Sequence, residues 1–122
     1  RAIIFGASGG IGAAIALALA GRGWQVAAGS RRGRVPDHMA IAPFRFDLAE
    51  ETSIAAAIDG VGPGDLDLAI VATGVLTLAS GAAPERSMRG IDPAAMLEMV
   101  RINTIGPAII AKHTLPRLPR ER

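Results

Sequence analysis

A glycine-rich segment near the beginning of the sequence has the composition of a phosphate-binding turn. It contains Gly6, Gly9, Gly10 and Gly12, and it directly follows the short apolar run Ala2–Phe5. Where such a turn joins a strand to a helix, its bare backbone N–H groups and the helix dipole favour an anion at the helix N-terminus. The segment therefore predicts a binding site for the diphosphate of a dinucleotide, and an ordinary tight turn is the alternative interpretation.

The residues after the next apolar run bear on which dinucleotide would bind. The run Gln25–Gly29 is followed by Ser30, Arg31 and Arg32. A carboxylate at the end of this strand would hold the 2′-hydroxyl of NAD, whereas a guanidinium makes charge-assisted contacts to a 2′-phosphate. We therefore expect NADP to be preferred. A solvated basic loop is the alternative, because Arg34 continues the cluster.

Asn103 stands four residues before Pro107 in a stretch with helical patterning. Proline has no backbone N–H, so Pro107 cannot donate a hydrogen bond to the carbonyl of Asn103. An unpaired carbonyl inside a helix is costly unless water or a side chain satisfies it. The pair therefore predicts a free acceptor near the site, and a simple proline kink is the alternative.

Strand and helix patterns alternate along the chain. We expect strands over Ala2–Phe5, Gln25–Gly29, Ile41–Phe46 and Asp67–Thr73, and helices from the glycine turn to Arg22, over Asp47–Ile58 and over Pro93–Leu115. Apolar residues spaced along one face of the first helix predict its buried side, and they are Ile11, Ala14, Ile15, Ala18 and Leu19. Alternation of this kind predicts an α/β fold with a parallel sheet covered on both faces.

Local signals refine this pattern. Pro43 predicts that the third strand lies at an edge of the sheet, since proline cannot donate to a ladder. Asp92 followed by Pro93 predicts the start of the last helix.

The composition excludes several classes of site. The sequence has no cysteine, so disulfides and thiol catalysis are excluded. His38 and His113 are isolated, and we expect no metal. Thirteen Lys and Arg against eleven Asp and Glu give a net charge of only +2 without a long basic block, so we expect no nucleic-acid partner. No uninterrupted apolar run reaches the roughly 18 residues of a membrane span, and we expect a cytoplasmic location without membrane binding.

Taken together, these residues resemble the short-chain dehydrogenase/reductase family. Gly6, Gly10 and Gly12 match its cofactor glycines, and Asp47 in Phe46-Asp47-Leu48 is similar to its acidic residue that contacts adenine. Asn103 resembles the asparagine of its Asn-Ser-Tyr-Lys catalytic set, whose main-chain carbonyl holds a water of the proton relay. The stretch from Val71 to Pro119 is most similar to the small C-factor-like branch of the family.

The resemblance implies a partial Rossmann-type, doubly wound parallel sheet of about four strands, formed by residues 1–122 as one NADP-binding domain. It implies hydride transfer between nicotinamide and a carbonyl or alcohol substrate, and a homodimer or homotetramer. The implied catalytic residue is Asn103, and the implied cofactor-binding residues are Gly6, Ser8, Gly9, Gly10, Ile11, Gly12, Ser30, Arg31, Arg32, Asp47, Leu48, Ala72, Thr73 and Gly74.

The sequence departs from the family pattern at three places. Phe5 stands where the family has threonine, and Val71-Ala72-Thr73-Gly74 replaces Asn-Asn-Ala-Gly. The catalytic Ser, Tyr and Lys of the family have no counterpart here, and we expect them beyond Arg122. Lys112 follows Asn103 on the same predicted helix, so we expect a surface role for it. Residues 1–122 are accordingly expected to be inactive alone, as the first half of an enzyme.

Two other functions stay open at this point. A non-catalytic NADP-binding sensor or signalling module would keep the fold without the chemistry. An extended, epimerase-like relative is also compatible, because the glycines fit both Gly-x-x-x-Gly-x-Gly and Gly-x-x-Gly-x-x-Gly. Ser and Tyr-x-x-x-Lys in the remaining gene sequence would favour the enzyme.

Overall fold

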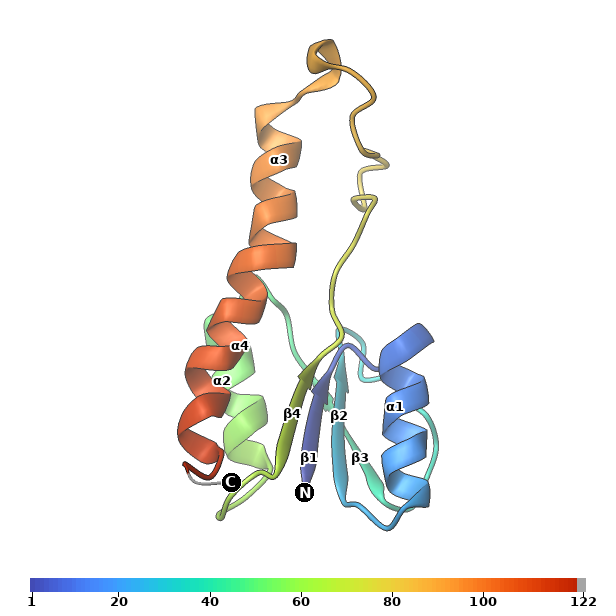
Figure 1. The fold of residues 1–122 in the computed structure, drawn as a ribbon, viewed down its shortest axis with the longest axis vertical. Coiled ribbons are helices and arrows are strands. Elements are labelled where there is room, and N and C mark those ends of the chain that lie inside the picture. Colours follow the sequence, from blue (N-terminus) through green and yellow to red (C-terminus); the bar gives the residue numbers. More distant parts are fainter. Residues whose placement is uncertain (121–122) are drawn as a thin grey trace.

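The computed structural model describes residues 1–120, whose strands form one parallel sheet with helices on both faces (Figure 1). The strands are β1 (Ala2–Phe5), β2 (Val26–Ser30), β3 (Ile41–Arg45) and β4 (Leu68–Val71), in the order β3-β2-β1-β4. Each neighbouring pair runs parallel, with β1 between β2 and β4. The sheet confirms the predicted α/β fold and its four strands, of which Ala2–Phe5 was predicted to the residue.

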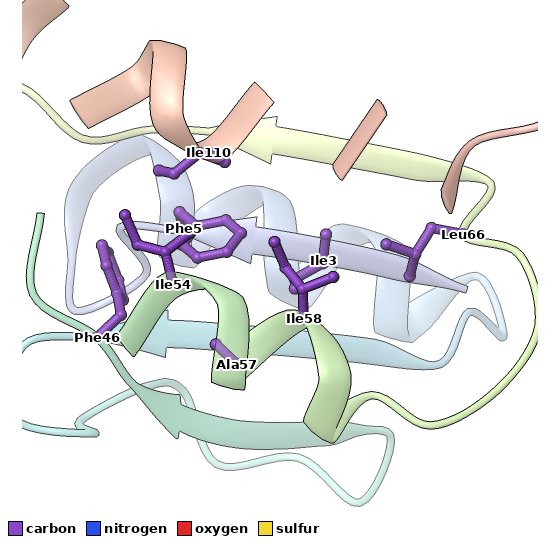
Figure 2. Close-up of a cluster of buried hydrophobic side chains, with 8 residues drawn as sticks. All are labelled: Ile3, Phe5, Phe46, Ile54, Ala57, Ile58, Leu66 and Ile110. Carbon is purple, nitrogen blue, oxygen red and sulfur yellow. The ribbon is translucent and has the colours of Figure 1, made fainter. Parts of the chain in front are cut away.

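One face of the sheet is covered by α2 (Glu51–Gly60) and α4 (Gly106–Thr114), as Figure 2 shows. Their apolar side chains pack on β1 and on the segments that follow β3 and α2. The buried members of this cluster are Ile3, Phe5, Phe46, Ile54, Ala57, Ile58, Leu66 and Ile110. The order of the elements therefore brings the last helix onto the first strand.

The opposite face is covered by α1 (Gly10–Gly21). Three small residues make its buried side, at intervals of four, and they are Gly12, Ala16 and Ala20. The predicted buried side is wrong in part: Ile11 is 75% exposed and Ala14 and Ala18 are exposed, whereas Ile15 and Leu19 are partly buried and pack against the core. The helix is apolar nearly all round, so periodicity could not choose its face; close approach to the sheet selects the smallest side chains.

All three phenylalanines of the sequence meet on the face covered by α2 and α4. The ring of Phe5 lies 5.1 Å from that of Phe44 and 5.0 Å from that of Phe46, both in edge-to-face arrangements. A Cβ on Gly29 would stand 2.1 Å from the ring of Phe44, so this strand position requires glycine. Phe5, which replaces the family's threonine, is thus an aromatic anchor of the core.

Strand β3 lies at one edge of the described sheet and carries Pro43, as predicted. Strand β4 lies at the other edge, where Val71 is 38% exposed. The strand itself, Leu68–Val71, is shorter than the predicted Asp67–Thr73.

Helix α2 begins at Glu51, four residues later than predicted, and ends at Gly60. Polar contacts hold Asp47 and the residues after it in a turn: the Asp47 carboxylate accepts from the N–H of Ala49 at 2.8 Å, and Glu50 donates to the Asp47 carbonyl at 3.0 Å. The hydroxyl of Ser53 completes the turn by accepting from the Asp47 N–H at 2.9 Å. These contacts compete with helix formation and delay its start.

The predicted helix Pro93–Leu115 is divided into several helical segments. Helix α3 (Pro93–Val100) begins after Asp92, whose side chain accepts from Ala94, as expected of a cap. A π-helical segment, η2 (Arg101–Ile105), then leads into α4, and a short 3₁₀ turn follows over Leu115–Arg117. The wider turn lies where Pro107 cannot donate to Asn103, so the proline is accommodated by a change of helical pitch.

The helical path Pro93–Arg117 is long and apolar enough to cross a membrane by length and composition alone, with a mean hydropathy of 1.3 over its most apolar window. No membrane span was expected from the sequence, because charged residues interrupt every apolar run. These few charged residues nevertheless leave the mean hydropathy of this helical path as high as that of a membrane helix. In the structure, Ile110 is buried against the sheet and Lys112 pairs with Glu51. We therefore interpret α4 as a packed helix of this domain.

Candidate cofactor site at the carboxyl ends of the strands

The glycine turn divides into positions required by packing and positions open to a ligand. Gly6 has a φ of +95°, and a Cβ on it would stand 2.7 Å from the carbonyl of Ala72. A Cβ on Gly12 would stand 1.9 Å from the carbonyl oxygen of Gly6. By contrast, apart from the adjoining backbone, no atom of residues 1–120 lies within 4 Å of a Cβ built on Gly9 or Gly10. The space over the N-terminus of α1 is therefore open where an anion would bind.

A cleft with a volume of about 1020 Å³ opens beside this turn. It lies at the carboxyl ends of β1, β2 and β4, which is where open α/β sheets bind ligands. Eleven of the predicted cofactor residues line it, and they are Gly6, Ser8, Gly9, Ser30, Arg31, Arg32, Asp47, Leu48, Ala72, Thr73 and Gly74. The fold thus gathers these residues from four separate parts of the sequence around one cleft.

The other predicted residues lie outside the lining. Gly10 begins α1 beside the cleft, and Gly12 packs below the turn. Ile11 is largely exposed at the same helix end. Asn103 also lies outside the lining, although its neighbours Arg101 and Ile102 belong to it.

Ser30 and the arginines after it, which the sequence predicts to hold a 2′-phosphate, line the cleft at the end of β2. Ser30 is only 4% exposed, and its hydroxyl has no hydrogen-bond partner within residues 1–120. Arg31, Arg32 and Arg34 line the cleft next to it, and none of the three has an ion-pair partner in the described part of the chain. A buried unpaired hydroxyl beside three free guanidiniums is suited to a phosphate ester.

Asp47 and Leu48 form the wall of the cleft just beyond the end of β3. One oxygen of the Asp47 carboxylate accepts from Ala49, so the turn described above also holds this carboxylate in place. Leu48 packs against Gly106, where a Cβ would stand 2.8 Å from a Leu48 methyl group. Glycine at position 106 therefore lets α4 approach this wall closely.

The side chain of Asn103 fixes the loop that follows β4. Its Oδ1 accepts from the N–H of Val75 at 2.8 Å, and its Nδ2 donates to the carbonyl of Val75 at 2.8 Å. Nδ2 also contacts the sulfur of Met99 at 3.8 Å. Sequence reasoning considered only the carbonyl of Asn103 and missed this bracing of a cleft-lining residue.

Several lining residues were not predicted at all. The side of the cleft formed by α3 and η2 contributes Ala94, Leu97, Glu98, Arg101 and Ile102, and the loop after β4 contributes Val75. No motif marks these residues, since their position depends on how α3 extends past the strand ends, as Figure 1 shows.

A cluster of charged side chains joins α2 to α4 outside the cleft lining. Glu51 at the start of α2 contacts Lys112 at 2.5 Å and His113 at 2.8 Å on α4. The hydrogen bond from Lys112, and then that from His113, lowers the pKa of the Glu51 carboxyl below its ordinary value. This cluster joins two helices, so Lys112 has a structural partner. Among the described residues no group of His, Cys, Asp or Glu is arranged to hold a metal.

Comparison with known proteins gives a consistent result. The family model for short chain dehydrogenase matches residues 1–122. Cis-4-hydroxycyclohexanecarboxylate dehydrogenase from Sinomonas cyclohexanicum is 33% identical over 93% of this chain and 47% of its own length. The chain therefore spans about half the length of this curated relative.

Solved structures share the fold at lower identity. A protein from Burkholderia multivorans described as a short-chain dehydrogenase/reductase, with bound NADP, superposes with a TM-score of 0.83 and 22% identity over 98% of this chain and 55% of its own. A carbonyl reductase from Pseudomonas aeruginosa PAO1 gives 0.81 and 24% over 98% of this chain and 57% of its own. With the glycine turn at the strand ends and a family match along the whole chain, this protein belongs to the short-chain dehydrogenase family.

Proposed function

We propose that this chain is the cofactor-binding part of an NADP-dependent oxidoreductase that acts on a carbonyl or alcohol substrate. The observation that carries the proposal is the glycine turn: the space over Gly9 and Gly10 is open at the N-terminus of α1, while Gly6 and Gly12 are packed against backbone. This arrangement leaves backbone N–H groups and the helix dipole available to a diphosphate.

The residues around the cleft fit NADP on both sides of that turn. Arg31 and Arg32, which have no ion-pair partner within residues 1–120, offer guanidiniums for the 2′-phosphate beside Ser30. Asp47 and Leu48 would hold the adenine, as the family resemblance implies. No carboxylate stands at the end of β2, where one would repel the 2′-phosphate.

When bound, NADP supplies the hydride chemistry, and the residues of this chain bind and orient it. Asn103 holds Val75 by two hydrogen bonds and thereby shapes the loop beside the cleft. Its carbonyl stands in the π-helical segment, where Pro107 cannot donate to it. We propose that Asn103 supports the proton relay from this position, in the manner that the resemblance implies.

The binding proposal is tested with Gly9→Ala. Gly9 has an extended backbone, which any residue adopts, and no atom lies within 4 Å of its Cβ. The added methyl group should therefore leave folding intact and enter the space assigned to the diphosphate. We expect NADPH affinity, measured by fluorescence titration, to fall by about tenfold or more.

The matched control is Gly21→Ala, since Gly21 ends the same helix and its Cβ position is equally open. This variant should bind NADPH like the unmodified protein. If Gly9→Ala also retained full affinity while folded, the diphosphate would not lie over the turn. Oxidation of NADPH by the full-length protein with a panel of carbonyl compounds then tests the reaction class.

We further propose that the full-length protein is a homo-oligomer that uses the outer face of α3 and α4. Large apolar side chains remain exposed along α3 and in the segments η2 and Leu115–Arg117 on either side of α4, and they are Met96, Val100, Ile105 and Leu115. A patch of this kind is typical of protein contacts. Replacing Leu115 by Glu should lower the mass measured by analytical ultracentrifugation. The similarity to the C-factor-like branch stays a prediction.

A further inference from the structure

One wall of the cleft is formed by a stripe of side chains along α3 and η2, where this helical path extends past the strand ends (Figure 1). Its members recur at intervals of three and four residues, which places them on one side of the path, and they are Ala94, Leu97, Glu98, Arg101 and Ile102. Leu97 is 71% exposed, and Glu98 and Arg101 are exposed as well. The stripe therefore presents an apolar surface with two charges to a ligand in the cleft.

The side chain of Arg101 is available to such a ligand. It has no ion pair or hydrogen bond within residues 1–120. Glu98 stands three residues earlier, at a spacing that permits an ion pair on a helix, yet the structure has none between the two. The carbonyl of Arg101, by contrast, accepts from the N–H of Gly106 across the π turn. The backbone of Arg101 is thus held in place while its guanidinium stays open to the cleft.

The proposed course of the dinucleotide puts Arg101 near its reacting end. Ser30 and the basic residues after it lie at the end of β2, and the glycine turn follows β1. Strand β4 lies on the other side of β1, and Val75 in the loop after it is hydrogen-bonded to Asn103 of η2. A dinucleotide whose 2′-phosphate lies beside β2 and whose diphosphate crosses the turn therefore extends its nicotinamide toward β4 and the stripe.

The charge of Arg101 is not needed by the cofactor, whose phosphates are already matched by the glycine turn and the arginines after Ser30. Among the described lining residues, Arg101 is the one basic group on the side formed by α3 and η2. A guanidinium binds a carboxylate through two parallel N–H···O bonds, and Leu97 and Ile102 on the same stripe offer apolar contact to a hydrocarbon body. A phosphate ester carries nearly two charges and would place the second beside Glu98, so a carboxylate fits better.

We propose that Arg101 is a specificity-determining residue that binds a carboxylate group of the substrate, so that this protein acts on carbonyl compounds or alcohols that combine a hydrocarbon body with a carboxylate. The inference rests on the proposed function of the cleft. Glu98 has the opposite effect, because its negative charge on the same stripe repels the substrate carboxylate. Removing one of the two charges should therefore shift the preference for acids downward, and removing the other should shift it upward.

The test uses matched pairs of ketones, each an acid and its methyl ester, with para-acetylbenzoate and levulinate as the acids. Oxidation of NADPH by the full-length protein gives kcat/KM for each compound, and titration gives the dissociation constant of NADPH. We expect the unmodified protein to prefer the acids. Arg101→Met should lower the ratio of kcat/KM between acid and ester about tenfold or more, mainly by raising the KM of the acid. Arg101→Lys, which keeps the charge, should restore part of the ratio.

Arg89→Met is the matched control, because Arg89 is an exposed arginine that does not line the cleft. This variant should keep the acid-to-ester ratio of the unmodified protein. Glu98→Gln should raise the ratio about two- to fivefold at low ionic strength, and the gain should shrink in salt because the residue is exposed. If Arg101→Met does not fold, Arg101→Gln and Glu98→Gln make the same comparison.

Equal kcat/KM for acids and esters in the unmodified protein would overturn the inference, and so would a ratio that Arg101→Met leaves unchanged. Equal losses for acid and ester, together with weaker NADPH binding, would show that Arg101 contacts the cofactor and would overturn it as well. A lower ratio in Glu98→Gln would contradict the opposing roles of the two charges. Absence of NADPH binding, or of reduction of every acid and ester, by the unmodified protein would overturn the proposed function itself.

Discussion

The carbonyl oxygen of Gly6 lies 1.9 Å from the position that a Cβ on Gly12 would occupy. The first and last glycines of the turn are therefore in backbone contact, and the helix start is pressed against the end of β1. The carbonyl oxygen belongs to the main chain and a Cβ is bonded directly to it, so neither atom could rotate away as the end of a flexible side chain would. Gly12 is therefore required for packing of α1 against β1. We expect it to influence cofactor binding only through the position of the glycine turn.

Gly12→Ala should therefore destabilise the protein before any ligand is added. Overpacking against backbone typically costs about 1–3 kcal/mol, and we expect at least this loss in the free energy of unfolding. Urea denaturation without cofactor measures it. The control Gly21→Ala, in the same helix with open space around its Cβ, should be neutral or slightly stabilising. Equal stability of the two variants would contradict the close approach.

Arg31→Ala should reduce the affinity for NADPH much more than that for NADH. A charge-assisted contact to the 2′-phosphate contributes roughly 1.5–3 kcal/mol, which corresponds to about tenfold or more in the dissociation constant. Parallel titrations with both cofactors measure the ratio. Arg22→Ala is the control, because Arg22 is exposed beyond the end of α1 and does not line the cleft. Equal losses of affinity for both cofactors would show that Arg31 does not contact the 2′-phosphate and belongs to a solvated basic loop.

Arg117→Met should destabilise the loop that follows α2. The Arg117 guanidinium donates to the carbonyls of Ile58 at 3.1 Å, Gly62 at 2.5 Å and Gly64 at 2.7 Å. It thereby satisfies the last turn of α2 and two glycines with positive φ. We expect a loss of about 1–3 kcal/mol in the free energy of unfolding. Arg120→Met, which changes an exposed residue in the same way, should leave the urea midpoint unchanged.

Glu51→Gln should lower stability at neutral pH and have no effect in acid. Lys112 and then His113 lower the pKa of the Glu51 carboxyl in the folded protein, so the unfolded chain binds this proton first as the pH falls. The stabilisation is present above the ordinary carboxyl pKa and is lost as the pH drops through the folded value. Urea midpoints should differ at neutral pH and converge once the pH lies below the lowered pKa of the folded protein.

Glu50→Gln is the matched control for this pair, since the Glu50 side chain makes no capping hydrogen bond. Its midpoint should follow that of the unmodified protein at both pH values. The difference for Glu51→Gln should also shrink in high salt, because the cluster is exposed to solvent. A difference that persisted in acid would assign another role to Glu51.

The strands and the glycine turn could be predicted because their signals are local. Ala2–Phe5 is a buried run followed at once by glycines, and Pro43 indicated the edge strand. The buried side of α1 could not be predicted, since alanines and larger apolar residues surround the helix and only packing selects among them. The late start of α2 could not be predicted either. It depends on a hydrogen bond between Asp47 and Ser53, and helix propensities of single residues do not reveal such a contact.

At the candidate site, too, residues with local sequence signals could be predicted, and contacts between distant residues could not. Ser30 and the arginines after it were predicted to line the cofactor site, and they do line the cleft. The hydrogen bonds from Asn103 to Val75 were not predicted, because they join parts of the chain that are distant in sequence. The position of Arg101 in the cleft lining was not predicted for the same reason. Burial of the Thr73 hydroxyl likewise follows from the contact between β4 and the glycine turn.

The π-helical segment Arg101–Ile105 lies between α3 and α4. It rotates the side chains of α3 around the helix axis relative to those of α4. A turn of this type holds about one residue more than an α-turn, and one residue corresponds to about 100° around a helix axis. The residues of α3 are thus rotated by that amount relative to an unbroken helix that continued from α4. Ile110 can then face the sheet while Leu97 and Arg101 face the cleft. Removing one residue from this segment would restore a continuous α-helix. Leu97 and Arg101 would then turn away from the cleft toward solvent.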